Sequence, residues 1–338
     1  MRSFNSCKEE FLLVKRSERR SIKTIKCYNY DLDRFKRYLL SKKIDISDIN
    51  KINKFHIISY LNYLTYDKKK WDDHKFNSNS SNQVGLSNTS VNNIRRNLKV
   101  FFKYLYKEEI IEKDPIENIS SQKEDRDKIE IFSKEQVEEL LDSPNKHTFT
   151  GFRDFLMMLI MLDNGIRINE LCNVKIRDID FQRKIIKIND KIAKNKKQRF
   201  IPISDIATNH IKTLIKYCRL ESSDYLILNQ YGEQLTTGCF AKNLKKYGQI
   251  CNIYNVRVSP HTLRHTFATN YLLNGGDVFS LQSILGHSSI DMVKRYIHYT
   301  EGFLNKVQNK CTPLKNIYYS DNSSSEKKSK KRIMFNML

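Results

Sequence analysis

The segment 151–165, GFRDFLMMLIMLDNG, constrains this chain most strongly, because it is apolar almost throughout. A helix that carries apolar side chains on every face must be buried on every face, so the segment predicts a central helix of a globular core. No apolar run in the chain approaches the length of about 20 residues that a membrane-spanning helix needs. We therefore place 151–165 inside a folded domain.

Three amphipathic helices are predicted before this segment. The first covers 21–43, where apolar residues recur at spacings of three and four and face away from Lys and Arg. The second covers 54–64, and the third covers 90–111, has a strongly basic face and ends before Asp114 and Pro115. The stretch 68–89 is polar, rich in Asn and Ser, and predicts a long loop.

A charged segment, 119–128, lacks apolar periodicity and predicts a linker between two domains. A helix restarts after it, where Ser133 and Gln136 have the spacing of a capping box. Isoleucines alternate with polar residues over 183–204 around a lysine-rich turn, which predicts two or three short strands. Further helices are predicted at 205–219 and 237–252.

The fold class is therefore mainly α with a small β-sheet. The predicted domains are an N-terminal helical domain (1–118), the linker (119–128), a C-terminal α+β domain (129–318) and a flexible basic tail (319–338).

The net charge of +22 arises because 60 Lys and Arg residues outnumber 38 Asp and Glu residues. Residues 320–338 carry five basic and two acidic side chains, so +19 falls on the rest of the chain. Such a charge favours a polyanionic partner, with nucleic acid the usual one. The alternative is a lysine bias from an AT-rich genome, since Ile and Asn are also abundant.

Seven cysteines occur without a CxxC pair, which predicts reduced thiols in the cytoplasm rather than a disulfide framework or a zinc ribbon. The N-terminus, MRSFNSCKEEF, does not have the pattern of a signal peptide.

Residues 259–276, SPHTLRHTFATNYLLNGG, hold the densest group of candidate functional side chains. A serine–proline pair predicts the start of a helix and two glycines predict its end. His261 and Arg264 are three residues apart and share a face. Cationic groups gathered this closely predict an anion site. A metal site on His261 and His265 is the alternative, which the positive charge of Arg264 between them disfavours.

The next two segments add a histidine and two tyrosines. DVFSLQSILGH predicts a short helix that Asp277 caps, that Gly286 ends and that is followed by His287 on a turn. SSIDMVKRYIHYT predicts a helix that carries Tyr296 and Tyr299. His287 and Tyr296 are nine residues apart.

These motifs resemble those of the tyrosine recombinases, the phage-integrase and Xer-type family. The family pattern is H-x-x-R, then an LGH histidine, then a tyrosine nine residues on; here the successive spacings are three, 23 and nine. Upstream, LDNGIRINEL resembles the family's TGLRISEL box, and KIAKNKKQRFIPIS resembles its hairpin, GKGNKER followed by VPL. The N-terminal helices resemble the family's core-binding DNA clamp, so the resemblance covers about 21–318.

The resemblance implies that the anion is a DNA phosphodiester and that Tyr296 is the nucleophile. Arg167 and Arg264 would each offer a planar fork of donors to its oxygens and stabilise the charge of the transition state, and His287 would add a donor. The product is a 3′-phosphotyrosyl bond, which keeps the energy of the phosphodiester. Rejoining therefore needs neither ATP nor another cofactor, and no metal ion.

Proton transfer would fall to two further residues. His261 would accept the proton of the phenol, and Lys194 would protonate the leaving 5′ oxygen. The turn glycines of the family's hairpin are absent here, so Lys196 stays an alternative to Lys194. Glu170 is expected to pair with a nearby arginine, and Tyr299 to pack as an aromatic.

The resemblance also implies the partners. We expect the chain to wrap double-stranded DNA with an inverted-repeat core site, and to act as a homotetramer, or with a paralogous recombinase, on two sites through a Holliday junction. The segment 301–318 would be donated to a neighbouring subunit. Only about 20 residues precede the first predicted helix. We therefore expect no arm-binding domain, an Xer-like or mobile-element enzyme, a cytoplasmic location on the nucleoid and no membrane partner.

Two other classes of protein stay open on the sequence. A type IB topoisomerase would use the same chemistry without selecting a site, and a non-catalytic DNA-binding protein would keep the fold alone. The intact set of reactive residues argues against the second.

Overall fold

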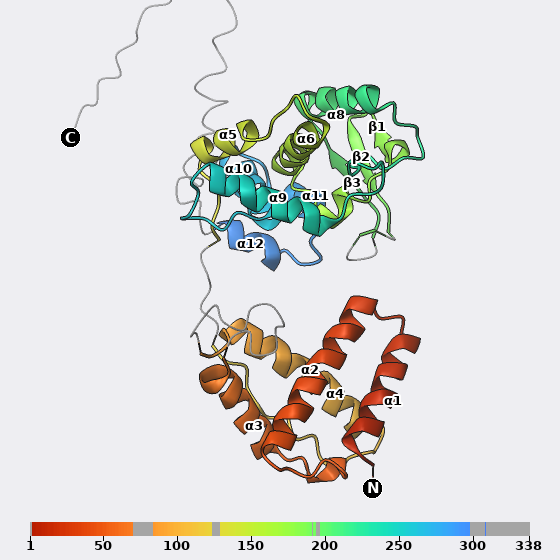
Figure 1. The fold of residues 1–338 in the computed structure, drawn as a ribbon, viewed down its shortest axis with the longest axis vertical. Coiled ribbons are helices and arrows are strands. Elements are labelled where there is room, and N and C mark those ends of the chain that lie inside the picture. The colour runs from red at the N-terminus through yellow and green to blue at the C-terminus, as the bar shows by residue number, and fades with distance from the viewer. Residues whose placement is uncertain are drawn as a thin grey trace, which may run out of the picture. The chain divides into compact units, whose positions relative to one another are not determined.

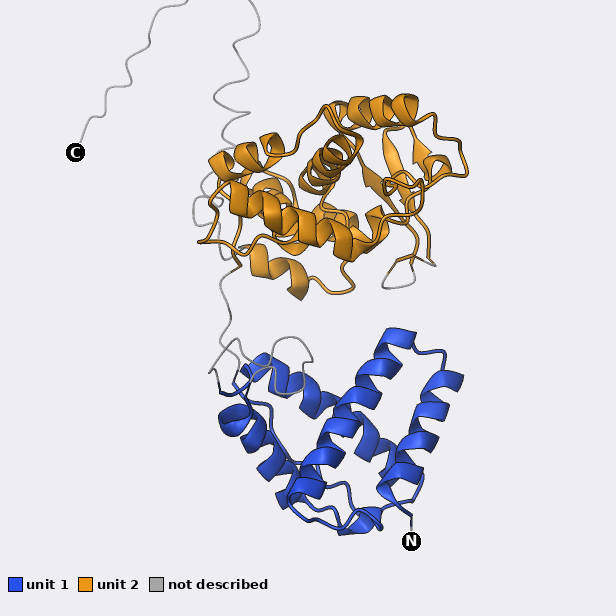
Figure 2. Ribbon diagram, in the orientation of Figure 1, with its two compact units in different colours: residues 1–127 blue, residues 128–338 orange. Residues whose placement is uncertain are grey.

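The computed structural model describes residues 2–69, 84–123, 129–190, 192–193, 197–297 and 308. It divides the chain into two compact units, 1–127 and 128–338 (Figures 1 and 2). The fold is mainly helical with one small antiparallel sheet, which confirms the predicted fold class. Within the described ranges, no helix has both the length and the apolar character that a bilayer crossing requires. The tail 319–338 and most of the loop 68–89 lie outside these ranges.

The described residues of the N-terminal unit form four α-helices with two short helical turns between them. The α-helices are α1 (Phe4–Ser17), α2 (Ile22–Ser41), α3 (Lys54–Asn62) and α4 (Asn88–Lys107), and the turns are a 3-10 turn (Ile49–Lys51) and a π-helical turn (Tyr63–Asp67). Each α-helix begins at a Ser or Asn whose side chain accepts a backbone N–H of the first turn. The core of the unit is rich in fully buried aromatic rings: Phe4, Phe11, Phe35, Tyr60, Phe101 and Phe102.

The helix predicted at 21–43 is confirmed as α2, but the helix that precedes it, α1, was not predicted. Phe4, Cys7 and Phe11 form its buried stripe, which the many charged residues around them obscure in the sequence. The helix predicted to reach residue 111 ends at Lys107, because Glu109 adopts a left-handed conformation (φ 53°) that a right-handed helix does not allow.

The C-terminal unit contains helices and a three-stranded antiparallel sheet that lies at one side of the unit (Figure 1). The strands are β1 (Ile179–Asp180), β2 (Ile185–Ile188) and β3 (Arg199–Pro202), in the order β1-β2-β3. Strands β2 and β3 lie within the range 183–204, where the alternating isoleucines predict strands, whereas β1 precedes it. The helices are α5 (Lys134–Asp142), α6 (Phe149–Asn164), α7 (Ile168–Leu171), α8 (Asp205–Cys218), α9 (Thr237–Ile250), α10 (Pro260–Leu273), α11 (Val278–Leu285) and α12 (Asp291–Ile297).

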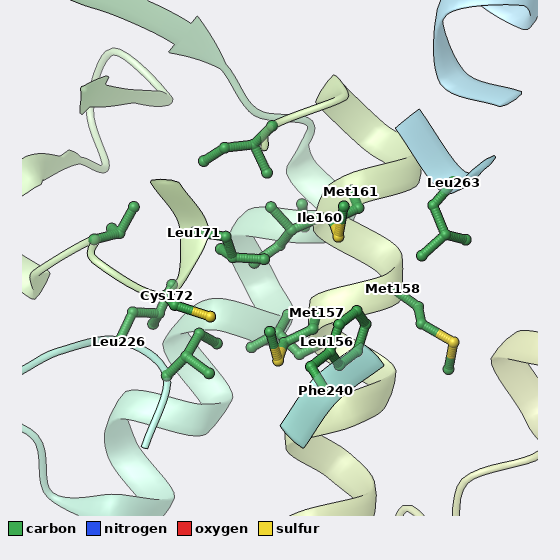
Figure 3. Close-up of a cluster of buried hydrophobic side chains, with 14 of the residues drawn as sticks. Leu156, Met157, Met158, Ile160, Met161, Leu171, Cys172, Leu226, Phe240 and Leu263 are labelled. Carbon is green, nitrogen blue, oxygen red and sulfur yellow. The ribbon is translucent and has the colours of Figure 1, made fainter. Parts of the chain in front are cut away.

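Helix α6 is the centre of the larger core, as its apolar sequence predicts. Its side chains pack against residues of α7, α9 and α10 and against Leu226 (Figure 3). The residues of this core that Figure 3 labels are Leu156, Met157, Met158, Ile160, Met161, Leu171, Cys172, Leu226, Phe240 and Leu263. A second, smaller apolar cluster joins α10, α11 and α12 and includes Phe267, Leu272, Leu285, Val293 and Tyr296. Helix α10 contributes to both clusters, so packing fixes it along its length.

Candidate active site

Helix α10 begins as the sequence predicts and divides its side chains between core and surface. The Ser259 hydroxyl accepts the backbone N–H of Thr262 (3.2 Å), and a proline occupies the first turn. Leu263 is fully buried, and Arg264 is only 7% exposed. His261, one turn before His265, is exposed.

The Arg264 guanidinium is held by backbone carbonyls from two other helix ends. It donates to the carbonyl oxygens of Gly165 and Leu285, the second at 2.8 Å, and one of its nitrogens lies 3.0 Å from His287 Nε2. Burial, followed by the charge of Arg167, lowers the pKa of Arg264 to about 9. The side chain is therefore charged at neutral pH and fixed in direction.

Two left-handed glycines provide carbonyl acceptors for the two predicted catalytic arginines. Gly165 (φ 64°) ends α6 and its carbonyl accepts from Arg264, whereas Gly286 (φ 63°) ends α11 and its carbonyl accepts from Arg167 Nη2 at 3.2 Å. These positions are the negative ends of helices, where a cation is favoured. A Cβ at Gly165 would lie 2.4 Å from a ring carbon of Phe267, so the glycine is also required by packing.

A buried glutamate connects Arg167 to a second arginine. Glu170 is fully buried, and it accepts from Arg167 Nη1 (3.0 Å) and from both terminal nitrogens of Arg199 (2.9 and 2.7 Å). Arg199 Nε donates in turn to the Ile284 carbonyl oxygen (3.0 Å). Burial alone would raise the pKa of Glu170, but the hydrogen bond and charge of Arg199, then those of Arg167, lower it. We call Arg167, Glu170, Arg199 and Arg264 the arginine cluster.

His287 lies beside the arginines of the site and is neutral at neutral pH. Burial, followed by the charges of Arg264 and Arg167, lowers its pKa to about 4. A guanidinium can only donate, so His287 Nε2 accepts from Arg264 and the ring proton lies on Nδ1. Within the described residues this buried Nδ1 has no hydrogen-bond partner. It is therefore a donor that no described residue uses.

Tyr296 lies on α12 and packs into the smaller apolar cluster. The residue is 2% exposed, and its hydroxyl lies 2.8 Å from His265 Nδ1. Burial raises the pKa of Tyr296, and the charge of Arg264 opposes that rise. Burial, followed by the charge of His261, lowers the pKa of His265 to about 4. At neutral pH the phenol is therefore protonated and the imidazole is neutral.

The structure thus brings together three of the six predicted catalytic residues at the end of α11: Arg167 and Arg264 donate to carbonyl oxygens there, and Arg264 also contacts His287. Tyr296 reaches the same helix, α10, through His265. The predicted pairing of Glu170 with an arginine is present twice. Lys194, Lys196 and Tyr299 lie outside the described residues.

Two residues of the site stand out in the structure and not in the sequence. Arg199 is one of many cations around the hairpin, yet alternation along β3 places it on the same face as the fully buried Ile201. The alternation along β3 is the feature of the sequence that could have predicted a buried arginine. The sequence suggested a role for His265 only as a metal ligand, through its spacing from His261. Among the described residues, no cluster of three or more His, Cys, Asp or Glu side chains could hold a metal ion.

Comparisons with known proteins point to one family. Residues 130–302 match the model of the phage integrase family, and residues 9–109 match that of the phage integrase N-terminal SAM-like domain. The tyrosine recombinase XerD of Staphylococcus saprophyticus is 30% identical over 234 residues, covering 68% of this chain and 78% of that protein. The tyrosine recombinase XerC of Thermodesulfovibrio yellowstonii is 30% identical over 239 residues, with the same coverage.

Two solved structures share the fold. The Tn1549 transposon integrase in complex with a circular intermediate DNA has a TM-score of 0.69 and 19% identity, covering 92% of this chain and all of that one. The XerH site-specific recombinase bound to a palindromic difH substrate has a TM-score of 0.64 and 22% identity, covering 89% of this chain and 82% of that one.

Proposed function

The chain belongs to the phage integrase family of tyrosine-type DNA recombinases, enzymes that break and rejoin DNA strands, and from that premise we propose how its own residues act. The proposed nucleophile is Tyr296, and the proposed phosphate site is formed by Arg167, Arg264 and His287. The observation that carries the proposal is the convergence of two backbone-anchored guanidiniums, the buried one of Arg264 and the partly buried one of Arg167, with an unused imidazole donor.

In the proposed cleavage step, the Tyr296 oxygen attacks phosphorus and the bond from phosphorus to the 5′ oxygen breaks. Arg167 and Arg264 donate to the non-bridging oxygens, where negative charge increases, and fixed donors of this kind are worth about 10²–10³ in rate each. His261 accepts the phenol proton, and Lys194 protonates the 5′ oxygen. A 5′ hydroxyl of another strand reverses these steps and rejoins the DNA.

The proposed substrate is double-stranded DNA with an inverted-repeat core site, and the proposed assembly is four copies on two sites that exchange strands through a Holliday junction. The proposed outcome is integration or excision of a mobile element, or resolution of chromosome or plasmid dimers. The match to relatives that are tyrosine recombinases supports this class, and so does the complex of a similarly folded integrase with a circular intermediate DNA.

The test is capture of the covalent intermediate in the native host. Cells that express the parent protein or Tyr296→Phe are lysed under denaturing conditions, and DNA covalently attached to the protein is sequenced. We expect parental adducts at one inverted-repeat site and none for Tyr296→Phe. Adducts in the variant would overturn the assignment of the nucleophile.

The same measurement separates the two enzyme classes. Parental adducts spread over unrelated sequences, together with relaxation of a supercoiled plasmid that lacks the captured site, would identify a type IB topoisomerase instead. A duplex of the captured site, nicked so that the cleaved strand is lost, then serves as the substrate for single-turnover rates.

A further inference from the structure

The Tyr296 hydroxyl contacts His265, a residue to which the proposed mechanism gives no part. The hydroxyl lies 2.8 Å from His265 Nδ1, and the two ring centroids are 5.6 Å apart at 49°. We propose that His265 is the positioning residue of the nucleophile: its Nδ1 accepts a hydrogen bond from the phenol and so directs the hydroxyl before attack. This inference rests on the proposed role of Tyr296.

The surroundings of the tyrosine explain why a partner is needed. The ring packs in the apolar cluster with Phe267, Leu285 and Val293, and the residue is 2% exposed. A buried hydroxyl that lacks a hydrogen bond lowers the stability of the protein by about 1–3 kcal/mol, so a hydrogen bond to His265 Nδ1 is favoured. That acceptor stands on α10 directly after Arg264. The hydrogen bond therefore directs the nucleophile toward the helix that carries a phosphate-binding arginine.

The direction of this hydrogen bond matters for attack. His265 is half-buried, and its pKa of about 4 leaves the ring neutral at neutral pH. A neutral imidazole whose Nδ1 accepts carries its proton on Nε2. The phenol is then the donor, so both lone pairs of its oxygen stay available to phosphorus. A donating Nδ1 would instead occupy one of them.

The two histidines of α10 thus have separable tasks. His265 is half-buried and contacts the phenol, whereas His261 is exposed at the start of the helix. Positioning requires only a polar acceptor at the place of Nδ1. In the attack step the single proton of the phenol must leave the hydrogen bond with Nδ1 and pass to a base, which the proposed mechanism assigns to His261.

The experiment compares three substitutions of His265 on the nicked duplex under single-turnover conditions. Asn places its side-chain oxygen close to the position of Nδ1, Gln places it farther out, and Ala removes it. We expect His265→Ala to form the covalent adduct about tenfold more slowly, the effect of one lost hydrogen bond. We expect His265→Asn to return to within about threefold of the parent and His265→Gln to stay slow. DNA affinity is expected to stay unchanged in all three variants.

The comparison of Asn with Gln decides the matter even if His265→Ala does not fold, because both amides have similar polarity. A parental rate for His265→Ala, or equal rates for Asn and Gln, would overturn the inference. Tyr296→Phe is run in parallel. If it forms adducts, the proposed function fails; if it is inert while His265→Ala is unaffected, only the role of His265 fails.

Discussion

The arginine cluster and α12 lie in the same unit but are held in place by different forces. Every guanidinium of the cluster is fixed by a buried carboxylate, by carbonyl oxygens of other elements, or by both. Helix α12 spans only Asp291–Ile297, and its buried residues Val293 and Tyr296 pack in the smaller apolar cluster. So short a helix is not stable by itself and depends on tertiary packing.

This difference fits the separate tasks of the two regions in the proposed reaction, where the arginine cluster binds the phosphate and α12 carries the nucleophile. Electrostatic stabilisation works best when the donors are already oriented, so the phosphate-binding side benefits from many directional contacts. A nucleophile must approach phosphorus and later release it, so its helix benefits from apolar packing with few directional contacts, of which the hydrogen bond of Tyr296 to His265 is one. The comparison makes four predictions about the free energy of unfolding of the catalytic unit, each measured by urea denaturation followed by circular dichroism.

The largest loss is expected for Glu170→Gln. The amide has nearly the same shape but leaves Arg167 and Arg199 facing each other without a counter-charge in a buried place, at a cost of about 3–5 kcal/mol. The control is Asp291→Asn on α12, which removes an exposed ion pair with Lys294 and is expected to change stability little. Equal effects of the two substitutions would show that the carboxylate does not hold the cluster.

The second prediction concerns acid. The pKa values of His265 and His287 are lowered to about 4, chiefly by burial, so the unfolded chain takes up protons below pH 6.5 that the folded chain does not. Stability should therefore fall as the pH drops from about 6.5 to about 4, by up to about 3 kcal/mol for each histidine.

Substitution of each histidine shows how much of this pH dependence arises beside the arginine cluster and how much beside α12. His287→Asn removes the contribution beside the arginine cluster, and His265→Asn removes the one beside α12. Each should flatten the dependence of stability on pH over this range. A slope that neither substitution changes would mean that other groups cause it.

A smaller loss is expected for Gly286→Ala. The positive φ costs an L-residue about 1–2 kcal/mol, and the new Cβ would lie 2.9 Å from Cδ and Nε of Arg199. Gly232→Ala is the matched control, since Gly232 also has a positive φ but its added Cβ would meet no atom within 4 Å beyond its chain neighbours. The excess of the first loss over the second measures the displacement of Arg199, and identical losses would show that Arg199 moves freely.

The smallest loss is expected for Tyr296→Phe. The ring keeps its place in the apolar cluster and only the hydrogen bond to His265 is lost, which costs about 1 kcal/mol. Covalent adduct formation is nevertheless abolished under the proposed mechanism. A loss of stability as large as that of Glu170→Gln would show that α12 is held by directional contacts after all.

Much of this molecule could be predicted from local patterns of residues. The caps at Ser133, Ser259 and Asp277, the helix stop at Gly286 and the central place of α6 all appear where the sequence predicts them. These features depend on hydrogen bonds between residues a few positions apart, or on the apolar character of one segment. Such causes are visible in a short window of sequence.

The contacts that complete the site were decided only by tertiary structure. Glu170 meets Arg199 29 residues later, Arg264 meets Gly165 99 residues earlier, and His265 meets Tyr296 31 residues later. The buried stripe of α1 does have helical spacings of three and four, but the choice of His265 as the partner of the phenol does not follow from spacing, because it depends on which surfaces the folded chain brings together. Local sequence determines where helices begin and end, whereas burial and the pairing of charges depend on elements that meet only after the chain has folded.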